Sequence, residues 1–360
     1  MSMLEEPRKE AIKGRGAVSN EASRFLPTRT LVVDDGWGYD PAADATPLIT
    51  VVLPDRTKTL ITRNQSPDVP FDHSINPYKG CEHGCIYCFA RPTHAFLDLS
   101  PGIDFETRLF YKTHVREHLT DELCRKNYVP TPMALGTNTD PYQPIERERR
   151  VTREILEVML ECRHPVTLVT KSAGALRDLD LWSELAQLGL AHVNVSITTL
   201  RRDLKTRLEP RTASPEARLR VLKEMSAAGV PVGVMAAPMI PFINDNELED
   251  ILGAARDHGA THANYILLRL PLEVQLLFSE WLDSHYPDKK ERVLSAIRDT
   301  RGGALYQSGF GQRMRGTGPI AELFAKRFQI AMKKLGLLRE RNVRLRQDLF
   351  RPPSPQGSLF

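Results

Sequence analysis

Three of the five cysteines of this chain lie within eight residues, where Cys81, Cys85 and Cys88 form the pattern C-x3-C-x2-C. A loop of this length that also contains Gly80 and Gly84 can wrap three thiolates around one inorganic core. No fourth cysteine stands nearby to complete the coordination shell. The spacing therefore predicts a metal centre with one open position, which is where a small molecule can bind and react.

Two other uses of these cysteines are open. A structural zinc site needs four ligands, and His83 or His94 could supply the fourth, although such sites usually come as two separated pairs of ligands. A disulfide framework is disfavoured because five cysteines in 360 residues are sparse and odd in number. Cys124 and Cys162 fall in helical patterns, so we expect them to pack inertly in the core.

Length and composition set the outer limits of the fold. With 360 residues and 41% hydrophobic content, the chain can bury a large core and form one barrel-sized domain with extensions. No apolar run approaches the roughly 20 residues needed to cross a bilayer, and no charged-then-apolar leader opens the sequence. We therefore expect a soluble, cytoplasmic protein with no membrane partner, and a reducing cytosol suits cysteines that must stay free.

Between residues 71 and 285, short apolar runs alternate with longer amphipathic ones. The apolar runs, which read as strands, span 132–136, 166–170, 192–198, 230–237 and 263–268. The amphipathic runs, which read as helices, span 114–126, 147–162, 176–188, 215–228 and 246–258. Strands separated by helices of this length predict parallel βα units. Counting one more strand that leads into Cys81, we expect an α/β fold built as a partial (β/α)6 TIM-like barrel.

An N-terminal extension, residues 1–70, precedes this core. About its first 25 residues are polar and weakly periodic, so we expect them to be poorly ordered. Short β-branched runs then predict strands at 30–33, 50–53 and 59–62.

The C-terminal extension, residues 286–351, is basic and reads as helical, with an amphipathic helix at 320–335 and a disordered tail at 352–360. Residues 301–351 carry twelve Lys and Arg against three Asp and Glu, although the net charge of the whole chain is +4. Such a region would attract a polyanion, and a solvated helix face explains the charge equally well. The segments starting at Arg301 and Arg313 combine arginine with glycine and could cradle phosphates or simply form turns.

Polar residues stand where the predicted strands end. They are Gly136-Thr-Asn-Thr-Asp140, Lys171-Ser172 and Ser196. Each alone would serve as a helix cap or turn. In a parallel barrel, however, the carboxyl ends of the strands meet at one rim, so we expect these residues to share a pocket above the cysteine loop.

Four further residues are weaker candidates for that rim. Glu209 and Arg211 could line it or form a surface salt bridge. Asn244 and Asp245 follow the fifth strand and could face a substrate, although capping the next helix is the simpler expectation.

The cysteine triplet, with aromatic Tyr87 before its last member, resembles the cluster loop of the radical S-adenosylmethionine (SAM) superfamily. The downstream residues are similar to the spore-photolyase-related branch of that superfamily. The runs 74–85, 136–146 and 268–273 resemble an uncharacterised bacterial subfamily of radical SAM proteins. This resemblance spans roughly residues 15–340 and leaves the substrate open.

The resemblance implies that Cys81, Cys85 and Cys88 bind three irons of a [4Fe–4S] cluster and that SAM chelates the fourth. Reduction would then cleave SAM to a 5′-deoxyadenosyl radical, which abstracts a hydrogen from the substrate. It also implies an electron donor of the flavodoxin or ferredoxin type.

Residue by residue, the resemblance assigns SAM contacts to the strand-end set. Thr139 and Asp140 match the loop that meets the SAM amino group, and Lys171 matches a lysine that pairs with its carboxylate. Ser196 matches a serine at the same group or at the ribose, and the backbone around Tyr87 would meet the adenine edge.

One departure from the spore-photolyase pattern concerns hydrogen return. Those enzymes use a cysteine in the second-strand loop to return a hydrogen atom to the product radical, whereas Thr137 stands at the matching position here. A hydroxyl is a much poorer hydrogen-atom donor than a thiol. A DNA- or RNA-lesion repair lyase is therefore an alternative to an unassigned radical SAM enzyme, and a metal-stabilised nucleic-acid-binding module is a third interpretation.

Overall fold

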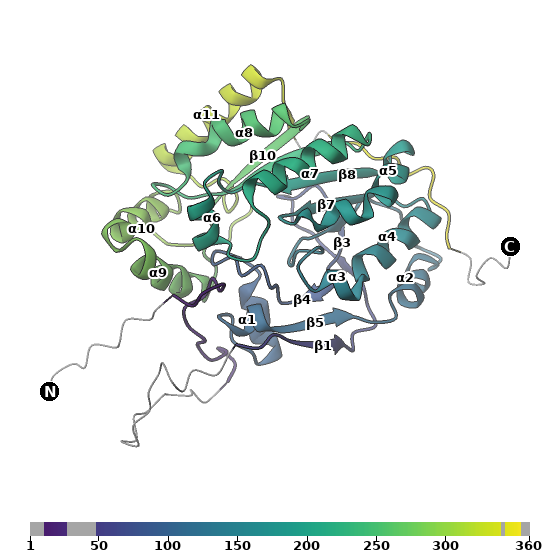
Figure 1. Ribbon diagram of the computed structural model, residues 1–360, viewed down its shortest axis with the longest axis horizontal. Coiled ribbons are helices and arrows are strands. Elements are labelled where there is room, and N and C mark those ends of the chain that lie inside the picture. The colour runs from purple at the N-terminus through teal and green to yellow at the C-terminus, as the bar shows by residue number, and fades with distance from the viewer. Residues whose placement is uncertain (1–10, 27–47, 340–342, 354–360) are drawn as a thin grey trace.

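The structure is a computed structural model that describes residues 11–26, 48–339 and 343–353. At its centre is an eight-stranded sheet in the linear order β11-β10-β9-β8-β7-β6-β3-β2 (Figure 1). Neighbours from β3 to β11 pair in parallel, and β2 pairs antiparallel with β3 at one edge. The strands are β2 (Ile61–Arg63), β3 (His73–Ile75), β6 (Met133–Leu135), β7 (Val166–Thr170), β8 (Ala191–Ser196), β9 (Val232–Met239), β10 (His262–Leu267) and β11 (Leu338–Arg339).

Helices connect these strands, so strand and helix alternate along the chain as the sequence predicts. α5 and α7 contact β8, α7 and α8 contact β9, and α11 contacts β10. The connecting helices are α2 (Val115–Leu123), α4 (Val151–Glu161), α5 (Leu179–Gln187), α7 (Pro215–Ala227), α8 (Leu248–Asp257) and α11 (Gly318–Leu335). The predicted partial barrel is therefore confirmed, with β3 as the strand that leads toward the cysteine loop.

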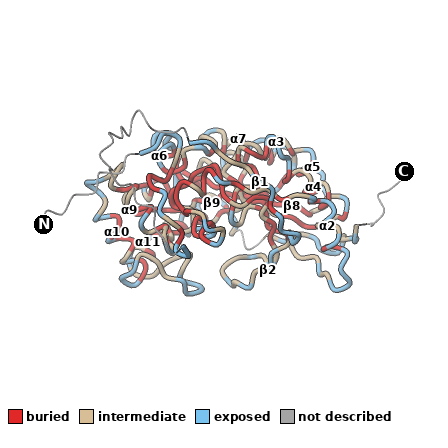
Figure 2. The backbone as a smooth tube through the Cα atoms, turned by 90° about the horizontal axis from the view of Figure 1, so that it is seen from below, coloured by how far each residue is buried: buried red, intermediate tan, exposed pale blue. Residues whose placement is uncertain are grey.

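Strands β6, β8 and β9 are buried on both faces along nearly their whole length, as parallel strands covered by helices must be. All six residues of β8 are buried, and the main hydrophobic cluster joins strand residues such as Leu168 to helix residues such as Ile155. Figure 2 shows this buried layer running through the middle of the molecule. Leu135 pairs with Leu168, and Leu168 with Val193, so the strand ends open onto one rim.

Local signals fix where the long helices begin and end. α7 starts with Pro215, and the Ser214 side chain accepts a hydrogen bond from the Ala217 backbone N–H at 3.2 Å. α11 ends at Gly336, whose φ of 67° places it in the left-handed region that glycine adopts readily.

A second, three-stranded sheet in the order β1-β5-β4 lies beside the barrel. β5 pairs in parallel with β1 and antiparallel with β4. Its strands are β1 (Val51–Asp55), β4 (Tyr78–Lys79) and β5 (Arg108–Lys112). The predicted runs at 50–53 and 59–62 correspond to β1 and β2, whereas the run at 30–33 and residues 354–360 of the tail lie outside the described residues.

Residues 11–26, part of the stretch expected to be poorly ordered, pack against the core instead. Ala17 is fully buried, and Glu106 accepts hydrogen bonds from the backbone N–H groups of Gly16 and Ala17 at 3.1 and 2.9 Å. Farther along, the Ser19 hydroxyl donates to Glu280 of α9 at 2.5 Å. In Figure 1 this purple segment runs between α1 and α9.

The remaining helices surround the cysteine loop and the C-terminal side of the barrel. The α-helices are α1 (Asp104–Thr107), α3 (Glu146–Arg149), α6 (Arg202–Leu208), α9 (Val274–His285) and α10 (Lys290–Asp299). The 3-10 helices are η1 (Arg91–Leu97), η2 (Ala173–Asp178), η3 (Asp245–Glu247) and η4 (Pro287–Lys289). Within the described ranges, no helix combines the length and apolarity needed to cross a membrane.

Candidate active site

The cysteine loop is a series of tight turns between β4 and η1. Backbone hydrogen bonds run from Gly84 N to Cys81 O at 3.3 Å and from Cys88 N to Cys85 O at 3.2 Å. Gly84 has φ +65°, and a Cβ there would lie 2.7 Å from a carboxylate oxygen of Glu106. Only glycine fits both the backbone conformation and the space, which explains its place between the first two cysteines.

A buried arginine, Arg91, donates hydrogen bonds to the backbone of the cysteine loop and of the segment that follows it. Arg91 is fully buried and donates from Nε to the carbonyl oxygen of Cys85 at 2.9 Å. Its Nη2 meets Glu106 at 2.5 Å, and its Nη1 binds the carbonyl oxygens of Pro101 and Gly102. Because Glu106 also holds residues 16 and 17, one carboxylate joins the N-terminal segment to the cysteine loop.

All three cysteines of the loop are free thiols. Burial, reinforced by the Glu209 carboxylate, raises the pKa of Cys85 to about 12. Burial likewise raises the pKa of Cys81 well above its usual value. A metal that binds such thiols must displace their protons, so its affinity rises with pH.

The thiols do not converge on a single point. Among the described residues, no three His, Cys, Asp or Glu side chains come together as ligands of one metal ion. In a mononuclear zinc site each sulfur lies about 2.3 Å from the metal, so the sulfurs would be about 4 Å apart. Iron–sulfur clusters use cysteine thiolates as ligands, each on a different iron, so the three free thiols of this one loop could hold three irons of a [4Fe–4S] cluster.

The two histidines considered as zinc ligands differ in position. His83 lines the pocket, and its Nδ1 lies 3.4 Å from an Asp140 carboxylate oxygen. His94 Nε2 instead contacts the carbonyl oxygen of Arg108 at 2.9 Å, and His94 is not among the described residues that line the pocket.

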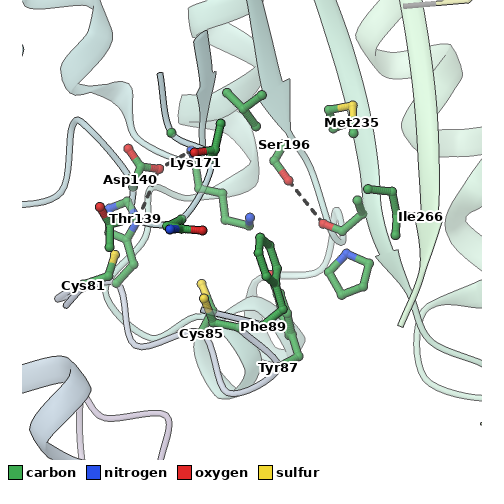
Figure 3. A pocket seen from close by; sticks show the side chains of 18 of the residues that line it. Cys81, Cys85, Tyr87, Phe89, Thr139, Asp140, Lys171, Ser196, Met235 and Ile266 are labelled. Atoms are coloured by element: carbon green, nitrogen blue, oxygen red, sulfur yellow. Dashed lines mark hydrogen bonds and ion pairs between the residues drawn. The ribbon is translucent and has the colours of Figure 1, made fainter. Parts of the chain in front are cut away.

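One pocket collects the cysteine loop and the strand ends (Figure 3). Every residue that the sequence singled out for cluster or SAM binding lines it: Cys81, Cys85, Tyr87, Cys88, Thr139, Asp140, Lys171 and Ser196. Thr139 and Asp140 follow β6, Lys171 follows β7 and Ser196 ends β8. The predicted shared pocket is therefore present, because the parallel register brings these strand ends to one rim.

Asp140 is a fixed anion at the edge of this pocket. One of its oxygens accepts from Thr170 Oγ1 at 2.7 Å and from the Tyr142 N–H at 2.9 Å. The other accepts from the Lys171 N–H at 2.7 Å and faces His83. Burial alone would raise the pKa of Asp140, but His83 and these hydrogen bonds lower it to about 2.

The hydroxyl oxygens of Thr139 and Ser196 at the rim can still accept hydrogen bonds from a ligand in the pocket. Thr139 donates to the Tyr78 carbonyl oxygen at 2.8 Å, and Ser196 donates to the Ala237 carbonyl oxygen at 3.2 Å. Since a hydroxyl donates once and accepts through two lone pairs, each oxygen can still accept a hydrogen bond from a ligand. Thr137 also lines the pocket and donates to Asn76 at 3.2 Å.

Lys171 supplies a positive charge at the wall of the pocket. Its Nζ lies 5.9 Å from the centre of the Tyr87 ring. The lysine forms no ion pair with any residue in the described ranges. An ammonium group held at the pocket wall in this way is a ready partner for a carboxylate.

The sequence did not predict that the Glu209 carboxylate is buried beside Tyr87 of the cysteine loop. Glu209, expected at the rim or in a surface salt bridge, is fully buried and ion-paired with buried Arg218. It also accepts hydrogen bonds from the hydroxyl groups of Tyr87 and Thr198. Burial would raise its pKa, but Arg218 and Lys171 lower it to about 2. Glu209 therefore anchors the ring of Tyr87 rather than facing solvent.

Other weaker candidates also serve the framework. Arg211 pairs with Glu82 at 3.2 Å, and Glu82 in turn accepts from the Ile145 N–H at 2.8 Å. These contacts clamp the cysteine loop to the loop after β6. Asn244 does not cap the following helix; its buried amide donates to the carbonyl oxygens of residues 198 and 238.

The two cysteines outside the loop occupy different environments. Cys162 is buried, as predicted. Cys124 is exposed at the end of α2, so the prediction that it packs in the core is wrong. A helical pattern does not reveal which face a residue at the helix terminus occupies. Neither thiol is among the residues that line the pocket.

The far wall of the pocket comes from β9, β10 and the end of the cysteine loop. It is mainly apolar and includes Met235, Ile266 and Leu268. Arg269 lies with its guanidinium 4.5 Å from the centre of the half-exposed Phe89 ring. In sequence, Met235 and Ile266 look like ordinary core residues, so they were not expected in the pocket, whereas Leu268 and Arg269 belong to the run 268–273 noted above.

Comparison with known proteins gives a family. The radical SAM superfamily matches residues 75–255, half of the chain. A Mycobacterium tuberculosis protein described as uncharacterized is 37% identical over 232 residues, covering 64% of this chain and 68% of that protein. A Methanocaldococcus jannaschii protein of the same description is 28% identical over 219 residues, covering 61% of this chain and 78% of that protein.

Solved structures show the same fold. Spore photoproduct lyase complexed with dinucleoside spore photoproduct has a TM-score of 0.58 at 16% identity, covering 80% of this chain and 81% of that one. A variant of that enzyme with bound AdoMet and the same dinucleoside has a TM-score of 0.59 at 15% identity and the same coverage. The matched half of the sequence contains the three cysteines and the strand-end residues 139, 140, 171 and 196, and the chain therefore belongs to the radical SAM superfamily.

Proposed function

We propose that this protein is a radical SAM enzyme in which Cys81, Cys85 and Cys88 hold a [4Fe–4S] cluster and SAM binds beside it. The observation that carries this proposal is the pocket itself, where three free thiols face a set of polar strand ends. When bound and reduced, the cluster supplies an electron that cleaves SAM to methionine and a 5′-deoxyadenosyl radical for hydrogen abstraction from a substrate.

The residues of the rim would orient SAM by complementary charge. Lys171, which has no carboxylate partner in the described ranges, would pair with the SAM carboxylate. The oxygens of Thr139 and Ser196 would accept hydrogen bonds from the amino group or the ribose. The Asp140 carboxylate already accepts from the Lys171 backbone, so it would add negative charge near the amino group while fixing the loop.

The apolar wall would protect the reaction from solvent. Met235 and Ile266 line the side of the pocket across from Asp140 and Lys171 (Figure 3), and Leu268 is a further apolar lining residue. Apolar side chains there exclude water, which strengthens the electrostatic contacts of the rim. The backbone around Tyr87 would meet the adenine edge, and the buried contacts of its ring with Glu209 and Lys171 keep that part of the loop in place.

A DNA- or RNA-lesion repair lyase is a second candidate, which the likeness to the fold of spore photoproduct lyase favours. The chemistry of the second-strand loop opposes it. Thr137 stands where a hydrogen-donating thiol would be expected, and the only thiols among the described lining residues are those of the cysteine loop. A structural role for the metal in a nucleic-acid-binding module would leave the polar strand ends without a purpose.

The proposal is tested by anaerobic reconstitution with iron and sulfide, followed by reduction in the presence of SAM. We expect about four irons per chain and release of 5′-deoxyadenosine and methionine. Cys85→Ala should abolish both, whereas Cys124→Ala, which alters an exposed cysteine outside the pocket, should leave both unchanged. A wild-type chain that takes up the iron but releases no 5′-deoxyadenosine would contradict the proposal.

Partners follow from the same chemistry. A flavodoxin- or ferredoxin-like protein would deliver the electron. Nucleic acid would bind through the basic C-terminal region, residues 286–351, and its affinity should then fall steeply as salt rises. An affinity that did not change between low and high salt would remove the electrostatic basis of that interaction.

A further inference from the structure

A second pocket lies on the other side of β10 from the candidate active site. Ile266 lines the candidate active site, whereas its neighbour Tyr265 stacks against Phe328 of α11 with ring centres 4.7 Å apart. Successive side chains of a strand point to opposite faces, so the two residues serve different pockets. The described lining of the second pocket is Tyr265, Arg315, Gly316, Thr317, Gly318, Ala321, Glu322, Ala325, Phe328, Gln329 and Arg339.

The arginine- and glycine-rich segment of the sequence supplies one wall of this pocket. Arg301 is buried, and its two terminal nitrogens donate to four backbone carbonyl oxygens. Arg313 pairs with Asp68 at 2.5 Å. Arg301 and Arg313 therefore stabilise the backbone of this segment. Arg315, the third arginine of the two Arg- and Gly-containing runs, lines the pocket, whereas Arg301 and Arg313 do not.

The charged side chains that line this pocket have a net positive charge. The Arg315 guanidinium stacks 4.1 Å from the centre of the Tyr265 ring and donates to Asn264 at 2.5 Å. Arg339 comes from β11 and forms no ion pair with any residue of the described ranges. The exposed Glu322 is the one carboxylate among the described lining residues. Two guanidinium groups thus face one carboxylate.

The amino end of α11 opens into the same pocket. This helix has 18 residues, its N-cap residue Thr317 makes no side-chain capping hydrogen bond, and its first turn has no acidic residue. The N–H groups of Gly316 and Thr317 already donate to the carbonyl oxygens of Gln312 and Thr300 at 2.6 and 3.0 Å, so the N–H groups open to a ligand are those of the first helical turn, from Gly318 onward. The uncapped N–H groups and the helix dipole both favour a negative ligand.

An independent observation also points to a ligand. Tyr265 is 2% exposed, yet its hydroxyl group has no hydrogen-bond partner among the residues that the structure describes. Buried hydroxyl groups almost always find a partner, because leaving one unsatisfied is unfavourable. A bound oxyanion in the pocket would accept the hydrogen bond that Tyr265 lacks.

We propose that this pocket binds a phosphate group, whose oxygens accept hydrogen bonds from Arg315, Arg339, the Tyr265 hydroxyl group and the amino end of α11. Guanidinium groups match phosphate geometry, and helix amino ends attract it. The phosphate can belong to a small phosphorylated molecule or to a phosphodiester backbone, and the site is separate from the cysteine-lined pocket.

The test measures binding of inorganic phosphate to the full chain by calorimetry and by thermal unfolding, which requires no cluster and no turnover. We expect wild-type protein to bind phosphate and gain thermal stability with it. Tyr265→Phe and Arg339→Gln should each weaken binding roughly tenfold. Glu322→Gln should strengthen it about threefold. The matched control Arg346→Gln, an exposed arginine outside the pocket, should bind like wild type.

Stability without phosphate separates binding from folding. Tyr265→Phe removes an unsatisfied hydroxyl group, so without phosphate it should be at least as stable as wild type, and only its response to phosphate should fall. A short single-stranded oligonucleotide that displaces phosphate would assign the site to a phosphodiester; failure to displace it would assign the site to small phosphates. Absence of phosphate binding to wild type, or equal binding by wild type and Tyr265→Phe, would overturn the proposal.

Discussion

The ion pair between Glu209 and Arg218 beneath the cysteine loop can be removed by a single isosteric change, Glu209→Gln. Both partners are buried, with exposed fractions of 0% and 1%. The pKa of Glu209 falls from its ordinary 4.5 to about 2. At about 1.4 kcal/mol per pKa unit, the folded state gains about 3 kcal/mol from this ionised carboxylate. Breaking a buried pair by removing one partner costs a similar 3–5 kcal/mol, roughly.

Urea unfolding at pH 7 measures this loss. The matched control is Glu216→Gln, because the pKa of Glu216 is also lowered to about 2, but by exposed Arg202 rather than by a buried partner. Solvent screens that exposed pair, so we expect the control to lose less than about 1 kcal/mol. Because Glu209 also binds the Tyr87 hydroxyl group, Glu209→Gln should in addition take up less iron on reconstitution.

The pH dependence has a defined sign. A carboxylate whose pKa is lower in the folded state stabilises the protein fully above its unfolded pKa of about 4.5, and that stability is lost as pH falls toward 2. The stability difference between wild type and Glu209→Gln should therefore be constant from pH 7 to about 5 and shrink below about 4.5. Equal losses in Glu209→Gln and Glu216→Gln at pH 7 would refute the reasoning.

Two further changes probe the SAM contacts and the loop. Lys171→Gln should weaken SAM binding roughly tenfold in equilibrium dialysis without changing the iron content. The control Lys223→Gln, which alters an exposed lysine, should change neither quantity. A loss of iron in Lys171→Gln would show that Lys171 has a structural role instead. Gly84→Ala should cost more than the ~1–2 kcal/mol of a left-handed alanine, because its Cβ also meets Glu106. Gly229 has φ +80° and open space around the position that a Cβ would take, so Gly229→Ala should lose only the stability that a left-handed alanine costs. The same unfolding experiment measures this loss.

The barrel was predictable because its signals are local. An apolar run such as 166–170 is β7 to the residue, and its flanking helices carry their own 3.6-residue periodicity. The candidate pocket was predictable for a related reason. Once the strands are parallel, their carboxyl ends share a rim, so Asp140, Lys171 and Ser196 must come together wherever the intervening helices lie.

The contacts that hold the cysteine loop were not predictable, because they join distant parts of the chain. Glu209 resembles a surface residue in sequence, and it is buried because Tyr87, 122 positions away, and Arg218 both reach it. Residues 11–26 have no periodicity, and their order depends on Glu106 about 90 positions later. No local pattern reports which distant partner satisfies a polar group.

The central claim is that the three thiols leave one iron open to SAM. Electron paramagnetic resonance of the reduced, reconstituted protein measures this directly, because a ligand on the open iron changes the spectrum of the cluster. The account predicts that SAM shifts the spectrum of wild type and that the shift needs a higher SAM concentration in Lys171→Gln. A reduced cluster whose spectrum is identical with and without saturating SAM would contradict it.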